Sequence, residues 1–255
     1  MRLAAVGDVH FAADSRGRLR GRLEAADPAP DLVLLAGDLT RRGSREEAEV
    51  LADELRSFPV PVVAVLGNHD YHLDQEAAIR EVLGQAGIQV LEGEATVLQV
   101  RGVTLAVAGV KGFGGGFAGA CATEFGEREM KAFVRTTRAA ADAFRGALDA
   151  VRDASVRIAL LHYSPVEQTL AGERLPLWPF LGSYLLGEAM DAGRAHLGFH
   201  GHAHAGSLHG VTAGGVPVFN VAQPLLGEPF LSLAVDEEGA VAATAGTALS
   251  DGRRG

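Results

Sequence analysis

The sequence predicts an α/β protein in which two stacked β-sheets carry helices on their outer sides. Short apolar runs alternate with helical segments in the first part of the chain, and further apolar runs joined by glycine turns follow. Apolar runs of about four to eight residues that end at glycine are typical of buried strands. The chain has 255 residues, of which 47% are hydrophobic, so it is long enough to bury both sheets in one domain.

Five apolar runs that end in clusters of Gly, Asp, Asn and His are expected to be buried strands. These runs are Leu3–Val6, Leu32–Ala36, Val60–Leu66, Val156–Leu161 and Leu197–Phe199. A helix is expected after the second run, because Ser44 and Glu47 have the spacing of a capping box, and it continues to about Arg56. A second helix is expected over residues 74–86, ending at Gly87.

The pattern changes after this helix to strands joined by tight turns, with Gly93 and Gly102 at the turns. The strands expected here are Ile88–Leu91, Ala95–Val100 and Val103–Val110. A long helix from Glu127 to about Arg152 follows, with its apolar positions at Met130, Phe133, Val134, Phe144 and Leu148. Three short strands are expected near the end, at Phe219–Val221, Phe230–Val235 and Ala240–Ala245. We expect residues 1–249 to form a single domain and the polar residues 250–255 to be a frayed tail.

Composition and charge argue against several classes of protein. The net charge of −9 does not suit a stable nucleic-acid complex, which needs surplus cations to displace counterions. There is no run of about 18 uncharged apolar residues, so no membrane span is expected. The single cysteine, Cys121, cannot form an internal disulfide, and no secretory signal precedes Asp8; we therefore expect a cytoplasmic protein. Nothing in the composition indicates an oligomeric state.

Aspartate, asparagine and histidine side chains gather where the five predicted strands end. They are Asp8, His10, Asp38, Asn68, His69, His162, His202 and His204. Binding sites of α/β proteins usually lie at the carboxyl ends of the strands, so these residues are expected to meet at one edge. Carboxylate, imidazole and amide ligands suit Mn, Fe, Zn or Co, so the sequence predicts a metal site there.

The order of these motifs resembles that of the calcineurin-like metallophosphoesterases. The matching motifs are Asp8-x-His10, Gly37-Asp38, Gly67-Asn68-His69-Asp70, His162 and Gly201-His202-x-His204. The resemblance implies a four-layer α-β-β-α sandwich of two mixed sheets flanked by helices, with a centre of two divalent or trivalent metal ions. By the same resemblance one ion would be bound by Asp8, His10 and His204, the other by Asn68, His162 and His202, and Asp38 would bridge them.

The resemblance also implies a hydrolase that acts on a small phosphate-ester substrate. Two cations about 3.5–4 Å apart can clamp a phosphate, and a bridging water that loses its proton attacks phosphorus. His69 would protonate the leaving oxygen, with Asp70 orienting its ring. A phosphodiesterase is the leading hypothesis. A phosphomonoesterase, including a nucleotide or protein phosphatase, and a non-catalytic scaffold with the same fold are the alternatives.

Several weaker signals lie outside these motifs. The run from Gly114 to Gly119 matches a dinucleotide-binding pattern, but no helix is expected to open there, so an active-site loop is favoured. Residues 111–126 and 163–180 are candidate walls of the site. Arg41 stands where cyclic-nucleotide phosphodiesterases of this superfamily often carry Asp, and it either reaches substrate phosphate or pairs with a glutamate, Glu46 or Glu49. Two further histidines, His72 and His200, are candidates for contacts around the ligands, and Lys111 is a further candidate cation.

Overall fold

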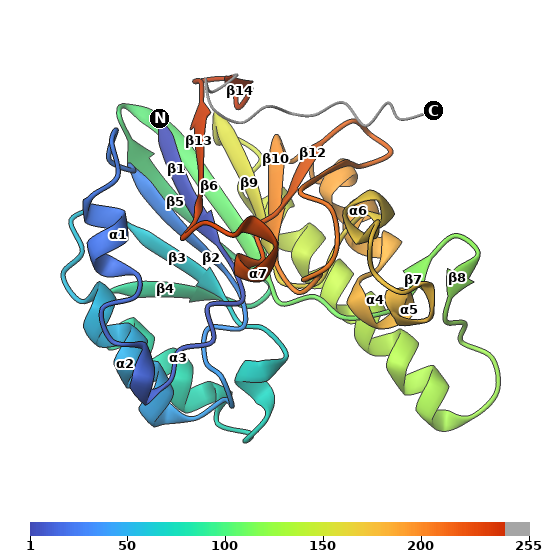
Figure 1. Ribbon diagram of the computed structural model, residues 1–255. Helices are drawn as coiled ribbons and strands as arrows, with labels where there is room; N and C mark the ends of the chain where they lie inside the picture. The colour runs from blue at the N-terminus through green and yellow to red at the C-terminus, as the bar shows by residue number, and fades with distance from the viewer. Residues whose placement is uncertain (243–255) are drawn as a thin grey trace.

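The computed structural model describes residues 1–242 and contains two six-stranded sheets that pack face to face (Figure 1). The strands of the first sheet are β1 (Arg2–Val6), β2 (Leu32–Ala36), β3 (Val62–Val65), β4 (Ile88–Leu91), β13 (Leu231–Val235) and β14 (Val241–Ala242). Their order is β14-β13-β1-β2-β3-β4. The four strands from β1 to β4 are parallel, whereas β13 runs antiparallel to β1, so the sheet is mixed.

The second sheet is also mixed. Its strands are β5 (Glu94–Val100), β6 (Val103–Val110), β9 (Val156–Leu161), β10 (Leu197–His200), β11 (His209–Val211) and β12 (Pro217–Asn220), in the order β11-β12-β10-β9-β6-β5. The inner strands are parallel, and the two edge strands β5 and β11 are antiparallel to their neighbours. A small separate hairpin is formed by β7 (Gly116–Phe117) and β8 (Ala120–Cys121).

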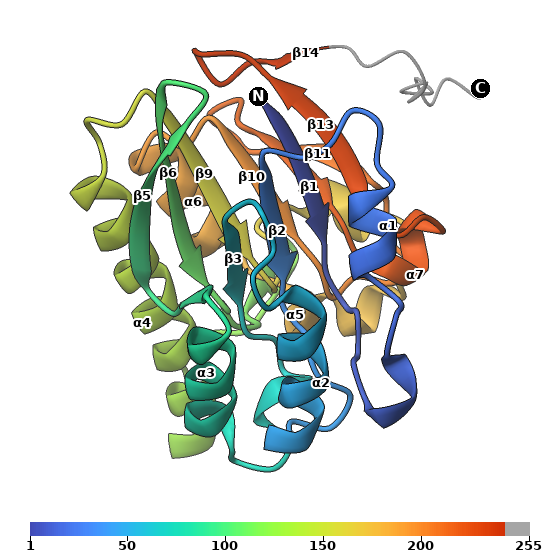
Figure 2. The same ribbon diagram turned by 90° about the vertical axis from the view of Figure 1, so that its left-hand side faces the viewer.

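Helices cover the outer face of each sheet, which confirms the expected four-layer sandwich. The helices α1 (Arg20–Glu24), α2 (Arg45–Leu55) and α3 (Glu76–Gln85) lie over the first sheet (Figure 2). The second sheet is covered by α4 (Arg128–Ala150) and α6 (Tyr184–Ala192). Two short helices, α5 (Trp178–Leu181) and α7 (Gln223–Leu226), complete the set. No helix within residues 1–242 is long and apolar enough to cross a membrane.

The continuous apolar runs of the central strands follow from burial on both faces. In β1, Leu3 and Ala5 point into the core between the sheets, whereas Ala4 and Val6 point into the core under the helices. Alternate side chains of a strand face opposite sides, so a strand with two covered faces needs apolar residues at every position.

The connection between β4 and β5 differs from the predicted hairpin. The turn lies at Gly93, as expected, but β4 pairs in parallel with β3 of the first sheet, whereas β5 pairs with β6 of the second. The backbone N–H of Gly93 donates to the carbonyl of Gly109 at 2.8 Å, where the chain changes sheets. Apolar pattern and glycine spacing give the position of a turn but not the sheet that receives the next strand.

Helix α2 begins at the predicted N-cap with only half of the predicted capping box. The Ser44 hydroxyl accepts from the Glu47 N–H at 3.2 Å, but the Glu47 carboxylate accepts from the N–H of Arg42 instead of Ser44. In the long helix α4, Met130 was expected at an apolar position and is 41% exposed. The predicted strand Ala240–Ala245 is present as β14 as far as the structure describes it, and the rest of it and the predicted tail lie outside the described residues.

We expect Phe144→Ala to lower the free energy of unfolding by about 3–5 kcal/mol, because the ring is fully buried between α4 and the second sheet. Phe125→Ala is the matched control: its ring is 85% exposed, and the change should stay within about 0.5 kcal/mol. Urea unfolding of both variants measures the difference. Equal stabilities would contradict this assignment of the core.

Candidate metal centre

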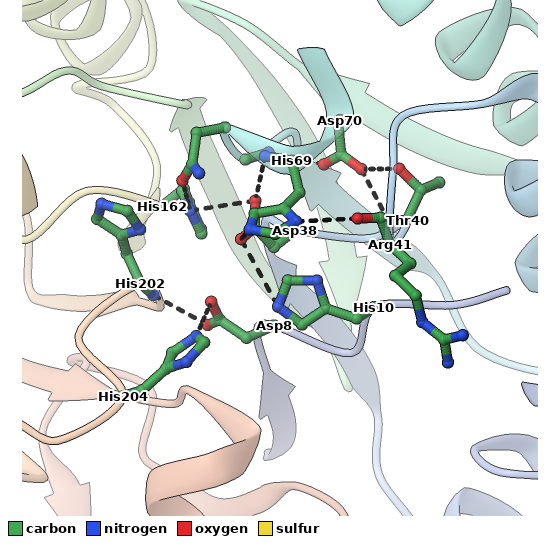
Figure 3. A network of polar contacts seen from close by, with 12 residues as sticks. Asp8, His10, Asp38, Thr40, Arg41, His69, Asp70, His162, His202 and His204 are labelled. Carbon is green, nitrogen blue, oxygen red and sulfur yellow. Dashed lines mark hydrogen bonds and ion pairs between the residues drawn. The ribbon is translucent and has the colours of Figure 1, made fainter. Parts of the chain in front are cut away.

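Five loops bring the predicted ligands together at one edge of the sandwich. Three of the loops follow β1, β2 and β3 of the first sheet, and the other two follow β9 and β10 of the second. Within each sheet these strands are parallel neighbours, so their carboxyl ends lie side by side. Figure 3 shows the side chains of Asp8, Asp38 and His204 within one cluster, with the imidazoles of the other loops around them.

The ligand atoms form three overlapping groups. In each group one atom of every residue lies within 4.8 Å of the others. The groups are Asp8, His10 and His204; His10, Asp38 and His69; and Asp38, His162 and His202. The amide oxygen of Asn68 lies 2.9 Å from His162 Nε2, which places it beside the third group. The first and third groups have the composition expected for two metal ions, and Asp38 of the third group also lies 3.7 Å from His10 of the first.

The ring of His162 shows that the cluster suits a cation. Its Nδ1 is 2.9 Å from the carbonyl oxygen of Ala36, and since that oxygen can only accept, Nδ1 donates. In the neutral ring Nε2 then carries a lone pair. This lone pair faces two further acceptors, Asn68 Oδ1 at 2.9 Å and Asp38 Oδ1 at 3.3 Å. Three acceptors that converge without a proton between them are stabilised by a metal ion, so the donor set fits one.

Burial and charge keep Asp8 and His202 in the forms that bind metals. The residues Asp8 and Asp38 are each 2% exposed. Burial alone would raise the pKa of Asp8, but the hydrogen bond from His204 and the nearby His162 hold that pKa below its usual value. Burial lowers the pKa of His202 to about 3, so its imidazole is neutral at pH 7. Carboxylate and neutral imidazole are the forms that bind metals.

The backbone is strained at four of the predicted ligands. Residues with left-handed φ include Asp8 at 57°, His10 at 43°, Asp38 at 49° and His202 at 70°. This conformation costs about 1–2 kcal/mol for a residue with a Cβ atom. Hydrogen bonds hold it in place; for example, the N–H of His10 donates to the carbonyl of Asp38 at 3.0 Å. Strain concentrated at one cluster is typical of a functional site.

Two glycines of the predicted motifs allow the ligands to approach this closely. A Cβ atom on Gly37, whose φ is +81°, would lie 2.5 Å from His162 Nδ1. A Cβ atom on Gly67 would lie 2.2 Å from both the backbone nitrogen and Oδ1 of Asp38. Neither position has room for a side chain while the carboxylate and the imidazole keep their places.

The predicted role of Asp70 in orienting the His69 ring is wrong. His69 Nδ1 donates instead to the carbonyl oxygen of Arg41 at 2.9 Å. The carboxylate of Asp70 is fully buried and accepts from the N–H groups of Leu39, Thr40 and Gly67 at 3.1, 2.8 and 2.7 Å and from the Thr40 hydroxyl. Burial raises the pKa of Asp70, and these hydrogen bonds oppose that effect. Asp70 therefore fastens the loop after β2 to the loop after β3.

Arg41 pairs with neither of the predicted glutamates. Its guanidinium group lies 2.9 Å from a carboxylate oxygen of Asp14, and its side chain points away from Asp38 (Figure 3). His72 is exposed, with its ring centroid 4.4 Å from that of His69.

His200 is fully buried and holds the loop that leads to His202. Its Nε2 lies 2.8 Å from the Thr169 hydroxyl, and its Nδ1 lies 2.7 Å from the carbonyl of Gly201. Burial lowers the pKa of His200 to about 4, so the ring is neutral.

The two candidate walls are joined to each other and to the ligand cluster. The N–H of Gly115 donates to Pro179 O at 2.7 Å, and His202 Nε2 donates to Phe180 O at 3.2 Å. The glycine run in the first wall leads into the β7–β8 hairpin and not into a helix, so the dinucleotide-binding pattern lacks the helix it requires.

Two tyrosines lie beside the ligands: Tyr163 is the first residue of the predicted wall 163–180, whereas Tyr71 was not predicted. Tyr163 follows His162 directly, and its ring centroid lies 4.5 Å from that of His202. Burial raises the pKa of Tyr163 to about 12. Tyr71 lies two residues after His69 in a 3₁₀ turn, His69–Tyr71. For Tyr71 the only sequence signal is that an aromatic residue stands two positions after a predicted site histidine.

A sequence profile of the family described as "Calcineurin-like phosphoesterase" matches residues 1–206, most of the chain. The protein belongs to this family. All residues of the ligand cluster thus lie within the matched segment.

Comparisons with individual proteins cover shorter segments or show the fold alone. The chain is 32% identical over 94 residues to a Synechococcus sp. protein named "Probable cyclic nucleotide phosphodiesterase". The matched segment covers 33% of this chain and 35% of the relative. It is 41% identical over 69 residues to the symmetrical bis(5'-nucleosyl)-tetraphosphatase of Dechloromonas aromatica, covering 27% and 24% of the two chains. The matched segments thus span about a third or less of these relatives.

One solved structure is similar to this protein over most of the chain. The phosphopantetheinyl hydrolase of Mycobacterium tuberculosis superposes with a TM-score of 0.62 over 87% of this chain and 89% of that one. The sequence identity is 16%, so this likeness concerns the fold.

We expect Asp70→Asn to lower the free energy of unfolding by about 1–3 kcal/mol, because the amide leaves buried N–H donors without an acceptor. The bound metal per chain should also fall, since the loops that carry Asp38 and Asn68 lose their fastening. Asp74→Asn, at an exposed residue four positions later, is the control and should change neither. Metal analysis and urea unfolding test both; wild-type metal content in Asp70→Asn would count against this role.

Proposed function

We propose that this protein is a metal-dependent hydrolase of phosphate esters that cleaves phosphodiesters at a dinuclear metal centre. The observation that supports this most is the position of Asp38 between two ligand groups. Its two carboxylate oxygens face different imidazoles, with Oδ1 3.3 Å from His162 Nε2 and Oδ2 3.7 Å from His10 Nε2. A carboxylate in this position can bridge two cations.

Each ion would have its own ligands besides the shared carboxylate. Asp8, His10 and His204 would hold one ion, and Asn68, His162 and His202 the other. The donor set suits Mn, Fe, Zn or Co. Bound there, the two ions would polarise a phosphate and lower the pKa of a water molecule toward neutrality. Asn68 supplies a neutral oxygen, which limits the negative charge that an anionic ester meets at the site.

His69 is placed to act as the general acid. Because its Nδ1 donates to the carbonyl of Arg41, the other ring nitrogen is the one that faces the cluster. His69 Nε2 lies 3.9 Å from Asp38 Oδ2. A proton on Nε2 would be directed toward an ester bound between the ligand groups, and its transfer to the leaving oxygen assists cleavage.

The position of Arg41 supports a preference for diesters. A monoester dianion carries two charges on phosphorus and benefits from an arginine that binds in a bidentate manner. Arg41, the candidate for that role, is paired with Asp14 and directed away. One relative is named a probable cyclic nucleotide phosphodiesterase, which agrees with a diester substrate.

The substrate class is tested by hydrolysis of bis-p-nitrophenyl phosphate and p-nitrophenyl phosphate side by side under the same metal. We expect the higher kcat/KM for the diester. A clearly higher value for the monoester would contradict the diester assignment and leave the metal centre in place. No hydrolysis of either ester by metal-loaded protein would contradict the enzymatic function.

Asp38→Ala should abolish hydrolysis and reduce the metal content at both positions, because the shared ligand is lost. Chelation should lower the Tm of the wild-type protein, since the ions link five loops, and should have little effect on Asp38→Ala. Asp53→Ala, at a side chain that is 50% exposed on helix α2, is the control. Elemental analysis and thermal unfolding give the readouts. Normal metal content in Asp38→Ala would refute the bridge.

His69→Ala should retain both metal ions but lose turnover, with the greatest loss for esters that have poor leaving groups. An ester that releases p-nitrophenolate needs little protonation, so its rate should fall less. The rates are compared for a p-nitrophenyl and an alkyl diester, with His209→Ala, at an exposed residue on β11, as the control. If both esters lose rate equally, His69 is not the general acid.

A further inference from the structure

Lys111 carries an ammonium group enclosed by aromatic rings. It is one of only two lysines among 23 cationic residues, and it directly follows strand β6. Its Nζ lies 4.8 Å from the ring centroid of Tyr71, 5.2 Å from that of Phe113 and 5.4 Å from that of Tyr163. Cation–π attraction from three sides fixes the position of the charge without using its hydrogen-bond donors.

The rings around Lys111 tie it to the metal ligands. The Tyr163 ring contacts that of His202 in a tilted arrangement, and Tyr71 ends the turn that begins with His69. The carbonyl of Lys111 itself accepts from the N–H of His162 at 3.1 Å and of Tyr163 at 3.0 Å. The ammonium therefore lies beside the loops after β3 and β9, close enough for the charge of Asp38 to act on it.

The three donors of the ammonium are not used by the protein. Within residues 1–242 no acceptor lies within hydrogen-bond or ion-pair distance of Nζ. Nζ is nevertheless not one of the buried polar atoms without a partner, so it remains open to solvent. The nearby Glu92 uses Oε1 to accept from the backbone N–H of Lys111 at 3.3 Å. Burial lowers the pKa of Lys111, whereas Glu92 and Asp38 raise it, so the carboxylates help the group to stay charged.

We infer that Lys111 is the substrate-binding cation of this site, and that its ammonium donates a hydrogen bond to a non-bridging phosphate oxygen of the ester held at the ligand cluster. The inference rests on the proposed function, because it assigns a further contact to the same substrate. The Lys111 ammonium is compact and carries one positive charge, which suits the single negative charge of a phosphodiester. A lysine that served only the fold would use its donors on protein acceptors.

The first test measures binding without turnover. Metal-loaded protein is acetylated with an amine-reactive ester in the presence and absence of inorganic phosphate, and the modification of each lysine is followed by peptide mass spectrometry. Phosphate should slow the acetylation of Lys111 about tenfold. Lys131, on helix α4, serves as the internal reference and should react at the same rate in both samples. Equal rates at Lys111 with and without phosphate would overturn the inference.

The second test removes the charge and keeps the volume. Lys111→Met retains an unbranched apolar stem between the rings, so metal content and Tm should stay at wild-type values. Its kcat/KM for bis-p-nitrophenyl phosphate should fall about 10- to 100-fold, mostly through KM, as expected for the loss of a charge-assisted hydrogen bond. Lys131→Met is the matched control. Wild-type kcat/KM in a folded, metal-loaded Lys111→Met protein would overturn the inference.

The two tests separate this inference from the proposed function. If the wild-type protein hydrolyses no ester, the proposed function fails, and the acetylation experiment still decides whether Lys111 binds phosphate. If Lys111→Met does not fold, the acetylation experiment on the wild-type protein decides alone. If hydrolysis is normal and phosphate does not protect Lys111, the hydrolase stands and the role of Lys111 falls.

Discussion

The buried carboxylate of Asp38 is the constraint on which the rest of the site depends. It accepts the N–H of His69 at 2.8 Å and faces imidazoles from both sheets, although almost no water reaches it. A buried charge is costly unless it is paired, so the surrounding loops have to supply positive charge or donors. The strained backbone at Asp38, the missing side chain at Gly67 and the fastening by Asp70 all serve to hold this one group in place.

The central strands and the ligand cluster were predictable because their signals are local. Each central strand has two covered faces and is therefore mostly apolar, and a glycine or a polar ligand follows soon after its end. The strands Leu32–Ala36 and Val156–Leu161 have the expected bounds for this reason. Parallel neighbours end at the same edge of their own sheet, so Asp8 and Asp38 could be placed together, whereas the meeting of Asp8 with His204 from the other sheet was implied by the family resemblance.

The features that were not predictable depend on contacts across the fold. The sheet that receives β5 is determined by its pairing with β6, which the turn at Gly93 does not specify. The partner of the His69 ring is a backbone carbonyl, and a backbone carbonyl leaves no mark in the sequence. The environment of Lys111 was likewise not predictable, because the three rings around its ammonium come from different segments of the chain.

The pairing of β1 with β13 has a consequence for how the protein is made. Strand β1 is central in its sheet, yet one of its neighbours begins at Leu231, which is synthesised much later. Until that segment is synthesised, β1 presents an open apolar edge, which is a template for pairing with other chains. The N-terminal amine also donates to Val235 O at 2.8 Å. Completion of this sheet is thus a late, long-range step, and slow folding with a need for protection during synthesis follows from the topology.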